Sequence, residues 1–273
     1  MKTKGLVYEI HCSNGPDSLT SLLDSAGLSE VLSSNKKQIL IKPNLVEALP
    51  PPITTPAALV EELVHYIKKN SPGTQIIVGE GCGSLNYETD YVFDVLGYTQ
   101  MALRTGIDLL DLNREPLVKL AKKSCRRWPE LHLPKILFES FLLSVPVLKA
   151  HTLAGVTLTM KNMMGTVPPK HYQQGGHWKK ASFHSGIDAA VYDLNQYRCA
   201  DFTLLDATIG MKEAHLGGPT CDPHPGKFAA GFDPVAVDSY GAKLLNKNWQ
   251  SVGHIALAHG KLGCAAPLNV RTL

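Results

Sequence analysis

The stretch TQIIVGEG (residues 74–81) is a continuous apolar run that ends in glycines on either side of a glutamate. Such runs are typical of strands that are buried on both faces of a parallel sheet. The stretch QILIKPNL (residues 38–45) has the same character and predicts a second strand, which stops at Pro43. Working outward from these two, we predict further strands at residues 5–11, 107–112, 141–148 and 201–207.

Amphipathic helical patterns lie between the predicted strands. A helix is expected to begin at Thr54-Thr55-Pro56, with a threonine as its N-cap and the proline at its first helical position. Asp233-Pro234 repeats this signal, and two more helices are predicted at residues 18–27 and 91–105. The alternation predicts a layered α/β fold with a mostly parallel sheet and flanking helices. An alternative arrangement of the same elements is two sub-lobes around a cleft. We expect one such domain over residues 1–273.

Charge and cysteine spacing exclude several classes of protein. The formal net charge of +3 is small for a dedicated nucleic-acid binder. The basic run at residues 122–128 is interpreted as a solvated loop, with contact to a phosphate backbone as the alternative. The six cysteines are scattered without any C-x-x-C spacing, so no zinc knuckle and no intrinsic iron–sulfur cluster are expected. The scattered thiols favour a cytoplasmic protein. No apolar run is long enough for a signal peptide or a membrane span.

The segment between Glu139 and Asp188 contains no acidic residue. It holds five lysines and four histidines, which are Lys149, Lys161, Lys170, Lys179, Lys180, His151, His171, His177 and His184. A local field of this sign raises the concentration of anions near it. Lysines beside glycine-rich turns bind phosphate or carboxylate, so the segment predicts a small anionic ligand. The alternative is a solvated basic loop, because lysines usually face water.

Two predicted strands end in a lysine followed by a hydrogen-bonding side chain. Lys42 and Asn44 close one strand, and Lys149 and His151 follow the strand predicted at residues 141–148. In open α/β sheets, ligands lie outside the carboxyl ends of the strands. The candidate site therefore consists of Lys42, Asn44, Lys149, His151, Lys161, Asn162, His184 and Asp206.

The first functional hypothesis is an enzyme that acts on a small anion. The lysines of the candidate site would bind phosphate or carboxylate, and Thr157 and Lys161 would share one face if their segment is helical. His151 and His184 would shuttle protons, since histidine titrates near neutral pH. Asp206 would orient an imidazole, or else cap a turn.

Other readings of the same residues stay open. Gly217 and Gly218 would let the backbone approach a ligand closely, or would form a plain turn. Histidines gather in the second half of the chain, but no pair has the spacing of H-E-x-x-H on a helix. A metal site built across loops is a further alternative, and the identity of any cofactor is left unknown.

Several short motifs occur in the order known from one family. They are Lys42-Pro43-Asn44, Thr54-Thr55-Pro56, VGEG (residues 78–81), VLKAH (residues 147–151), Thr157-x-x-x-Lys161-Asn162-x-x-Gly165, His184, Asp206, Gly218-Pro219 and DPVAVD (residues 233–238). In this order the chain resembles the family catalogued as domain of unknown function 362, or DUF362. The resemblance spans nearly the whole chain.

The resemblance implies two further hypotheses. Many members of the family carry an appended iron–sulfur ferredoxin domain, which implies a redox role. This chain has no cluster-binding cysteine run, so a redox role would need an iron–sulfur partner protein. The family is also distantly similar to the nickel-pincer lactate racemases, in which lysine and histidines hold an organometallic cofactor. A non-catalytic anion-binding module is the third hypothesis.

Overall fold

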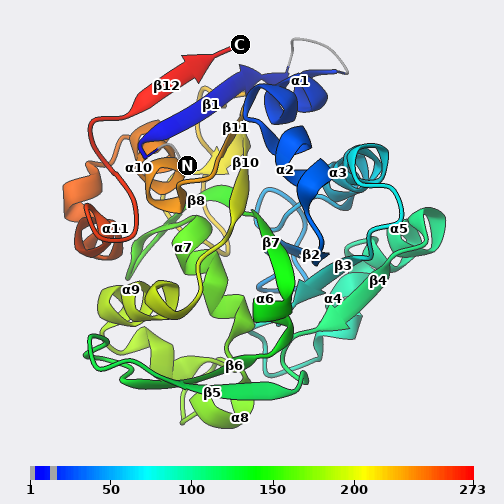
Figure 1. The fold of residues 1–273 in the computed structure, drawn as a ribbon. Helices are drawn as coiled ribbons and strands as arrows, with labels where there is room; N and C mark the ends of the chain where they lie inside the picture. Colours follow the sequence, from blue (N-terminus) through cyan, green and yellow to red (C-terminus); the bar gives the residue numbers. More distant parts are fainter. Residues whose placement is uncertain (1–3, 13–16) are drawn as a thin grey trace.

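The computed structural model describes residues 4–12 and 17–273 of the chain, and within them ten strands form one sheet (Figure 1). These strands are β1 (Leu6–His11), β2 (Gln38–Pro43), β3 (Ile76–Glu80), β4 (Asp108–Asp111), β7 (Ser140–Val145), β8 (Val147–His151), β9 (Gly155–Thr157), β10 (Phe202–Met211), β11 (Lys227–Gly231) and β12 (Asn269–Thr272). A separate antiparallel hairpin is formed by β5 (Leu117–Ala121) and β6 (Glu130–Pro134).

Helices cover both faces of the sheet. One face is covered by α1 (Ser18–Ser25), α2 (Leu28–Ser34), α3 (Ala57–Asn70), α4 (Thr89–Val95) and α5 (Tyr98–Thr105). The other face is covered by α6 (Ile136–Glu139), α7 (Thr159–Asn162), α8 (Pro169–Tyr172), α9 (Ile187–Tyr197), α10 (Pro234–Leu244) and α11 (Gly253–Ala258), together with the hairpin. Short 3-10 helices occur at Met163–Thr166, Ala181–His184 and Trp249–Ser251.

The centre of the sheet is parallel. β2 pairs in parallel with β3 and β7, β3 with β4, and β7 with β10, whereas β11 runs antiparallel to both β1 and β10. Along β2 the fully buried side chains alternate, with Leu40 in one core and Ile39 and Ile41 in the other. The predicted α/β fold, with a mostly parallel sheet between helices, is therefore confirmed.

Two predicted helix features are wrong. The helix predicted at residues 91–105 is two helices, because Gly97 has a φ of 79° and serves as the N-cap of α5. The predicted threonine N-cap of α3 is also wrong, since Pro56 occupies the N-cap position. The Thr55 hydroxyl instead donates to Val145 O and accepts from Asn44 N, which ties the start of α3 to the ends of β2 and β7.

The strand predicted at residues 141–148 is also divided. Pro146 separates β7 from β8, because proline has no N–H with which to continue a strand ladder. Lys149 and His151 thus lie within β8, not beyond a strand end, and β8 pairs with β10 and β9. Thr157 and Lys161 share no helix face either, since Thr157 ends β9 and Lys161 lies in α7.

Candidate functional site

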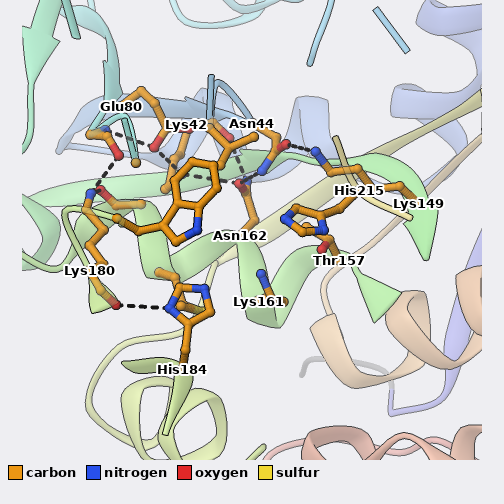
Figure 2. A pocket seen from close by; sticks show the side chains of 16 residues that line it. Lys42, Asn44, Glu80, Lys149, Thr157, Lys161, Asn162, Lys180, His184 and His215 are labelled. Carbon is orange, nitrogen blue, oxygen red and sulfur yellow. Dashed lines mark hydrogen bonds and ion pairs between the residues drawn. The ribbon is translucent and has the colours of Figure 1, made fainter. Parts of the chain in front are cut away.

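A cavity lies where the carboxyl ends of β2 and β3 meet β8, β9 and α7 (Figure 2). Its volume is ≈ 70 Å³. The lysines that line it are Lys42, Lys149, Lys161 and Lys180, all buried, whereas Glu80 is the one carboxylate among the described residues that line it. Because four lysines and one carboxylate line it, the titratable side chains around the cavity are predominantly basic.

Lys42 and Glu80 form a buried ion pair at the ends of β2 and β3. Lys42 Nζ lies 2.7 Å from Glu80 Oε1, and burial lowers the pKa of Lys42 while the Glu80 charge opposes that shift. The second oxygen, Glu80 Oε2, accepts from Leu45 N at 2.9 Å, and Oε1 also accepts from Gly81 N at 2.9 Å. A Cβ at Gly165 would overlap both Glu80 Oε1 and Lys42 Nζ, so a glycine is required there for the loop to pass so close.

Two asparagines connect this ion pair to β8. Asn162 Oδ1 accepts from Lys42 Nζ at 3.2 Å and from Asn44 Nδ2 at 2.9 Å. Asn44 Oδ1 in turn accepts from Lys149 Nζ at 2.7 Å, and Lys149 Nζ also donates to Ile53 O at 2.6 Å. Burial, followed by the charge of Lys161, lowers the pKa of Lys149 to about 7. The network joins the ends of three strands with α7 and fixes the orientation of both amides.

Lys180 is held in the same manner from the opposite wall. Its Nζ donates to Gly81 O at 2.6 Å, to Asn113 Oδ1 at 2.7 Å and to Gly165 O at 2.9 Å. Burial lowers the pKa of Lys180 to about 7. Lys180 thus fastens the segment before His184 to the end of β3, and its hydrogen-bonding capacity is used by the protein itself.

Lys161 differs from the other three lysines. Its side chain is 8% exposed, and in the part of the chain that the structure describes no hydrogen-bond acceptor reaches its Nζ. Figure 2 shows the Lys161 ammonium between Asn162, His184 and His215, with no dashed line to it. Burial lowers the pKa of Lys161 to about 8. Lys161 is therefore a buried amine that has no hydrogen-bond partner among the described residues.

Further unpartnered groups surround Lys161. Thr157 belongs to the lining of the cavity, and neither its Oγ1 nor the buried His151 Nε2 has a hydrogen-bond partner among residues 4–12 and 17–273. His151 Nδ1 accepts from Leu153 N at 3.0 Å and from Ala154 N at 3.1 Å, so the ring proton is on Nε2. Burial, and next the charge of Lys161, lowers the pKa of His151 to about 2. His151 is thus a neutral Nε2–H donor.

Two more histidines complete this side of the cavity. The ring of His215 stacks on that of His151 with 4.0 Å between centroids, and burial lowers the pKa of His215 to about 3. His184 Nδ1 lies 3.2 Å from Lys180 O, a carbonyl that can only accept, so Nδ1–H donates and Nε2 keeps a lone pair. Burial, and next the Lys161 charge, lowers the pKa of His184.

Most of the residues predicted for the site come together. Lys42, Asn44, Lys149, Lys161, Asn162 and His184 line the cavity, and His151 lies directly behind His215. The reading of the acid-free segment as a solvated loop is wrong for Lys149, Lys161, Lys179 and Lys180, which are buried. Lys170, in contrast, is exposed.

Three predicted residues lie elsewhere. Asp206 is inside β10 rather than at a strand end, and it lines a different small cavity, where its Oδ1 accepts from Thr208 N and Oγ1. Gly217 and Gly218 do not line the cavity around Lys161, and a Cβ at either would meet nothing within 4 Å. Their placement shows no close approach to that cavity.

Among the lining residues that sequence reasoning left out of the site are Glu80, Trp178, Lys180 and His215. Glu80 lies in the VGEG motif, but a single glutamate at a strand end gave no sign that it would pair with Lys42. Lys180 and Trp178 belong to the acid-free segment, and His215 is separated from it by more than a whole helix and strand. Only the fold brings His215 onto His151, so no local pattern could have identified it.

The structure also bears on the predictions about metals, membranes and nucleic acid. Within residues 4–12 and 17–273, no group of three or more His, Cys, Asp or Glu side chains could hold a metal ion. No helix in the same residues is long and apolar enough to cross a membrane. The basic run at residues 122–128 connects β5 to β6, and it is fastened to α9 by Arg127 N and Trp128 N, which both donate to Asp193.

Comparisons with known proteins add a family and a fold. The family model described as "Domain of unknown function (DUF362)" matches residues 39–243. Among solved structures, the lactate racemase apoprotein from Thermoanaerobacterium thermosaccharolyticum is similar, with a TM-score of 0.52 and 12% sequence identity. The match covers 89% of this chain and 57% of that chain, so this chain spans a little more than half of the racemase. At this identity the likeness concerns the fold. No curated protein matches the sequence.

Proposed function

The chain belongs to the DUF362 family, and we propose that it binds a small carboxylate or phosphate at the amine of Lys161. The observation that carries this proposal is the buried Lys161 Nζ, which meets no acceptor among the described residues. Burying a charge without a partner is unfavourable, so an anion that pairs with Lys161 would relieve that penalty. The matching ligand group is an oxyanion.

The other free groups around Lys161 support an oxyanion. Thr157 Oγ1 and His151 Nε2 are buried without partners, and both can donate a hydrogen bond. Lys42, Lys149 and Lys180 add positive charge from fixed positions, with Glu80 as the single opposing charge among the described lining residues. A ligand with several acceptor oxygens and negative charge satisfies all of these groups at once.

The size of the cavity narrows the ligand further. A volume of ≈ 70 Å³ gives room for roughly five to seven water molecules. Phosphate and a three-carbon acid are of about this size. The lactate racemase that shares the fold is named for a three-carbon carboxylate, so lactate and pyruvate are suitable first ligands to test.

The same arrangement supports proton transfer at the bound anion. Because His184 Nδ1–H donates to Lys180 O, its Nε2 lone pair is available as a general base. His151 is less suited, since its Nδ1 is occupied by two backbone N–H groups and its pKa lies near 2. We therefore assign the proton to His184 and the role of fixed donor to His151.

For a cofactor of the nickel-pincer type, which lysine and histidines hold, the cavity would offer Lys161 and the Nε2 lone pair of His184. The Nδ1 atom of His151 accepts from two backbone N–H groups, so this nitrogen would not be a ligand of such a cofactor.

The binding proposal is tested by calorimetric titration with phosphate, lactate and pyruvate. We expect Lys161→Met to weaken binding at least about tenfold, as the loss of a charged hydrogen bond does. The matched control is Lys170→Met, which removes an exposed lysine of the same acid-free segment and should leave affinity unchanged. Equal affinity in both variants would refute the proposal.

The catalytic part is tested separately by NMR. Pyruvate incubated with the protein in heavy water should exchange its methyl protons for deuterium, and His184→Ala should slow this exchange about 100-fold while keeping the affinity. Binding without any exchange in the wild-type protein would favour the non-catalytic anion-binding module.

A further inference from the structure

The amine of Lys161 is presented to the cavity by a fixed backbone. Asp238 accepts from Thr159 N at 2.7 Å and from Met160 N at 2.9 Å, which anchors the start of α7. On the other side, Asn162 Nδ2 donates to Ser144 Oγ at 3.0 Å, and Asn162 Oδ1 accepts from Asn44. Lys161 is thus anchored through both chain neighbours while its own Nζ is free, which is the arrangement of a positioned reactive group.

Such an amine has a chemistry that the other three lysines lack. Lys42, Lys149 and Lys180 direct their N–H groups at fixed acceptors, and moving any of these amines would leave buried oxygens unpaired. Lys161 donates to no acceptor among the described residues, so its amine can move without leaving an oxygen unpaired, and burial favours its neutral form. A desolvated lysine beside other cationic groups is a nucleophile toward carbonyl carbon.

We propose that Lys161 forms a Schiff base with a small 2-oxo acid in this cavity. The inference rests on the anion-binding function proposed above and adds a carbonyl group to the ligand. The carboxylate would accept from the free donors Thr157 Oγ1 and His151 Nε2, and the carbonyl carbon would face Lys161 Nζ. A three-carbon 2-oxo acid has six non-hydrogen atoms, about the number that a cavity of ≈ 70 Å³ admits.

The covalent step balances without an oxidant or a reductant. The lone pair of the neutral Lys161 amine attacks the carbonyl carbon, the C–N bond forms, and the carbonyl electrons move to oxygen. His184 Nε2 takes the proton lost by the amine and returns it to that oxygen. A second proton transfer from nitrogen to the same oxygen lets it leave as water, and the nitrogen lone pair completes the C=N bond.

The test is reductive trapping with pyruvate as the probe. Wild-type protein and the variants Lys161→Met and Lys170→Met are incubated with pyruvate and cyanoborohydride, and intact-mass and peptide analysis locate the carboxyethyl adduct. We expect one adduct on Lys161 in the wild type and in Lys170→Met, and labelling at least about tenfold lower in Lys161→Met. A prior incubation with lactate, which has no ketone carbon to form an imine, should protect Lys161 from labelling.

The outcomes separate this inference from the function on which it rests. Calorimetric binding of lactate and pyruvate that needs Lys161, combined with no adduct at Lys161, would overturn the Schiff base and leave the anion site standing. No binding of any tested anion would overturn both. Labelling spread over exposed lysines and equal in Lys161→Met would show ordinary surface chemistry and would also overturn the Schiff base. Thermal unfolding of each variant verifies that the protein tested is folded.

Discussion

Four buried lysines line one cavity, yet they form two kinds. Lys42, Lys149 and Lys180 each donate to two or three acceptors that the strands and loops hold in place. Lys161 is equally part of the wall, but no acceptor among the described residues reaches it. The difference teaches that acceptors, and not charge, distinguish lysines that hold the scaffold from a lysine that awaits a ligand.

The largest effect on stability is expected from breaking the ion pair between Lys42 and Glu80. Glu80→Gln should destabilise the protein by about 3–5 kcal/mol, because it leaves Lys42 as an uncompensated buried charge. The measurement is chemical denaturation monitored by circular dichroism. The double variant Lys42→Met with Glu80→Gln removes both charges and should recover part of that loss. A change of less than about 1 kcal/mol for Glu80→Gln alone would show that the pair is not structural.

The same substitution at two lysines should act in opposite directions. Lys149→Met leaves Asn44 Oδ1 and Ile53 O without their donor, so we expect a loss of about 1–3 kcal/mol in the free energy of unfolding. Lys161→Met leaves no acceptor unpaired and removes a buried charge, so it should stabilise the apoprotein by on the order of 1 kcal/mol. Denaturant midpoints of the two variants measure both. A destabilised Lys161→Met would place Lys161 among the scaffold lysines.

The pH dependence of stability and of anion affinity should also have opposite signs. The pKa values of Lys149, Lys161 and Lys180 are lowered to about 7, 8 and 7, below those of the unfolded chain. Between pH 7 and the usual lysine range, the unfolded state therefore binds more protons, and the stability of the apoprotein should rise with pH. Anion affinity should fall over the same range, as the ammonium of Lys161 is lost.

Denaturation and calorimetry at about pH 7 and about pH 9 measure these two slopes. The Lys161→Met variant serves as the control. Its stability should still rise with pH, because Lys149 and Lys180 remain, but its anion affinity should no longer show the fall with pH that Lys161 causes. Stability and affinity that rise together would contradict the assignment of these buried lysines.

The sequence allowed the sheet and part of the site to be predicted, for identifiable reasons. The apolar runs at residues 38–45 and 74–81 are local signals, and both became central parallel strands. Pro146 was overlooked within an apolar run, so β7 and β8 were joined in the prediction. The free state of Lys161 could not be predicted at all, because it depends on acceptors that are absent around one amine and present around three others.

His215 and Asp206 show in two ways that the sequence alone does not place residues in the cavity: His215 was not predicted and lies there, whereas Asp206 was predicted and does not. His215 reaches the cavity only because the chain after β10 returns to β8, where its ring stacks on His151. Asp206 looked like a residue at a strand end, but β10 continues to Met211 and carries Asp206 into a separate cavity. Spacing along the chain does not predict the position of either residue in the fold.

The smallest expected effect concerns Asp206. Burial raises the pKa of its carboxyl group, and Oδ1 accepts from Thr208 N and Oγ1, which an asparagine oxygen can also do. Because Asp206 lines another cavity, Asp206→Asn should change the affinity for pyruvate by less than about twofold. The same titration that detects a tenfold loss in Lys161→Met measures it. If Asp206→Asn weakened binding as much as Lys161→Met, the ligand would have to reach β10. Asp206 would then belong to the ligand-binding residues and not to the scaffold.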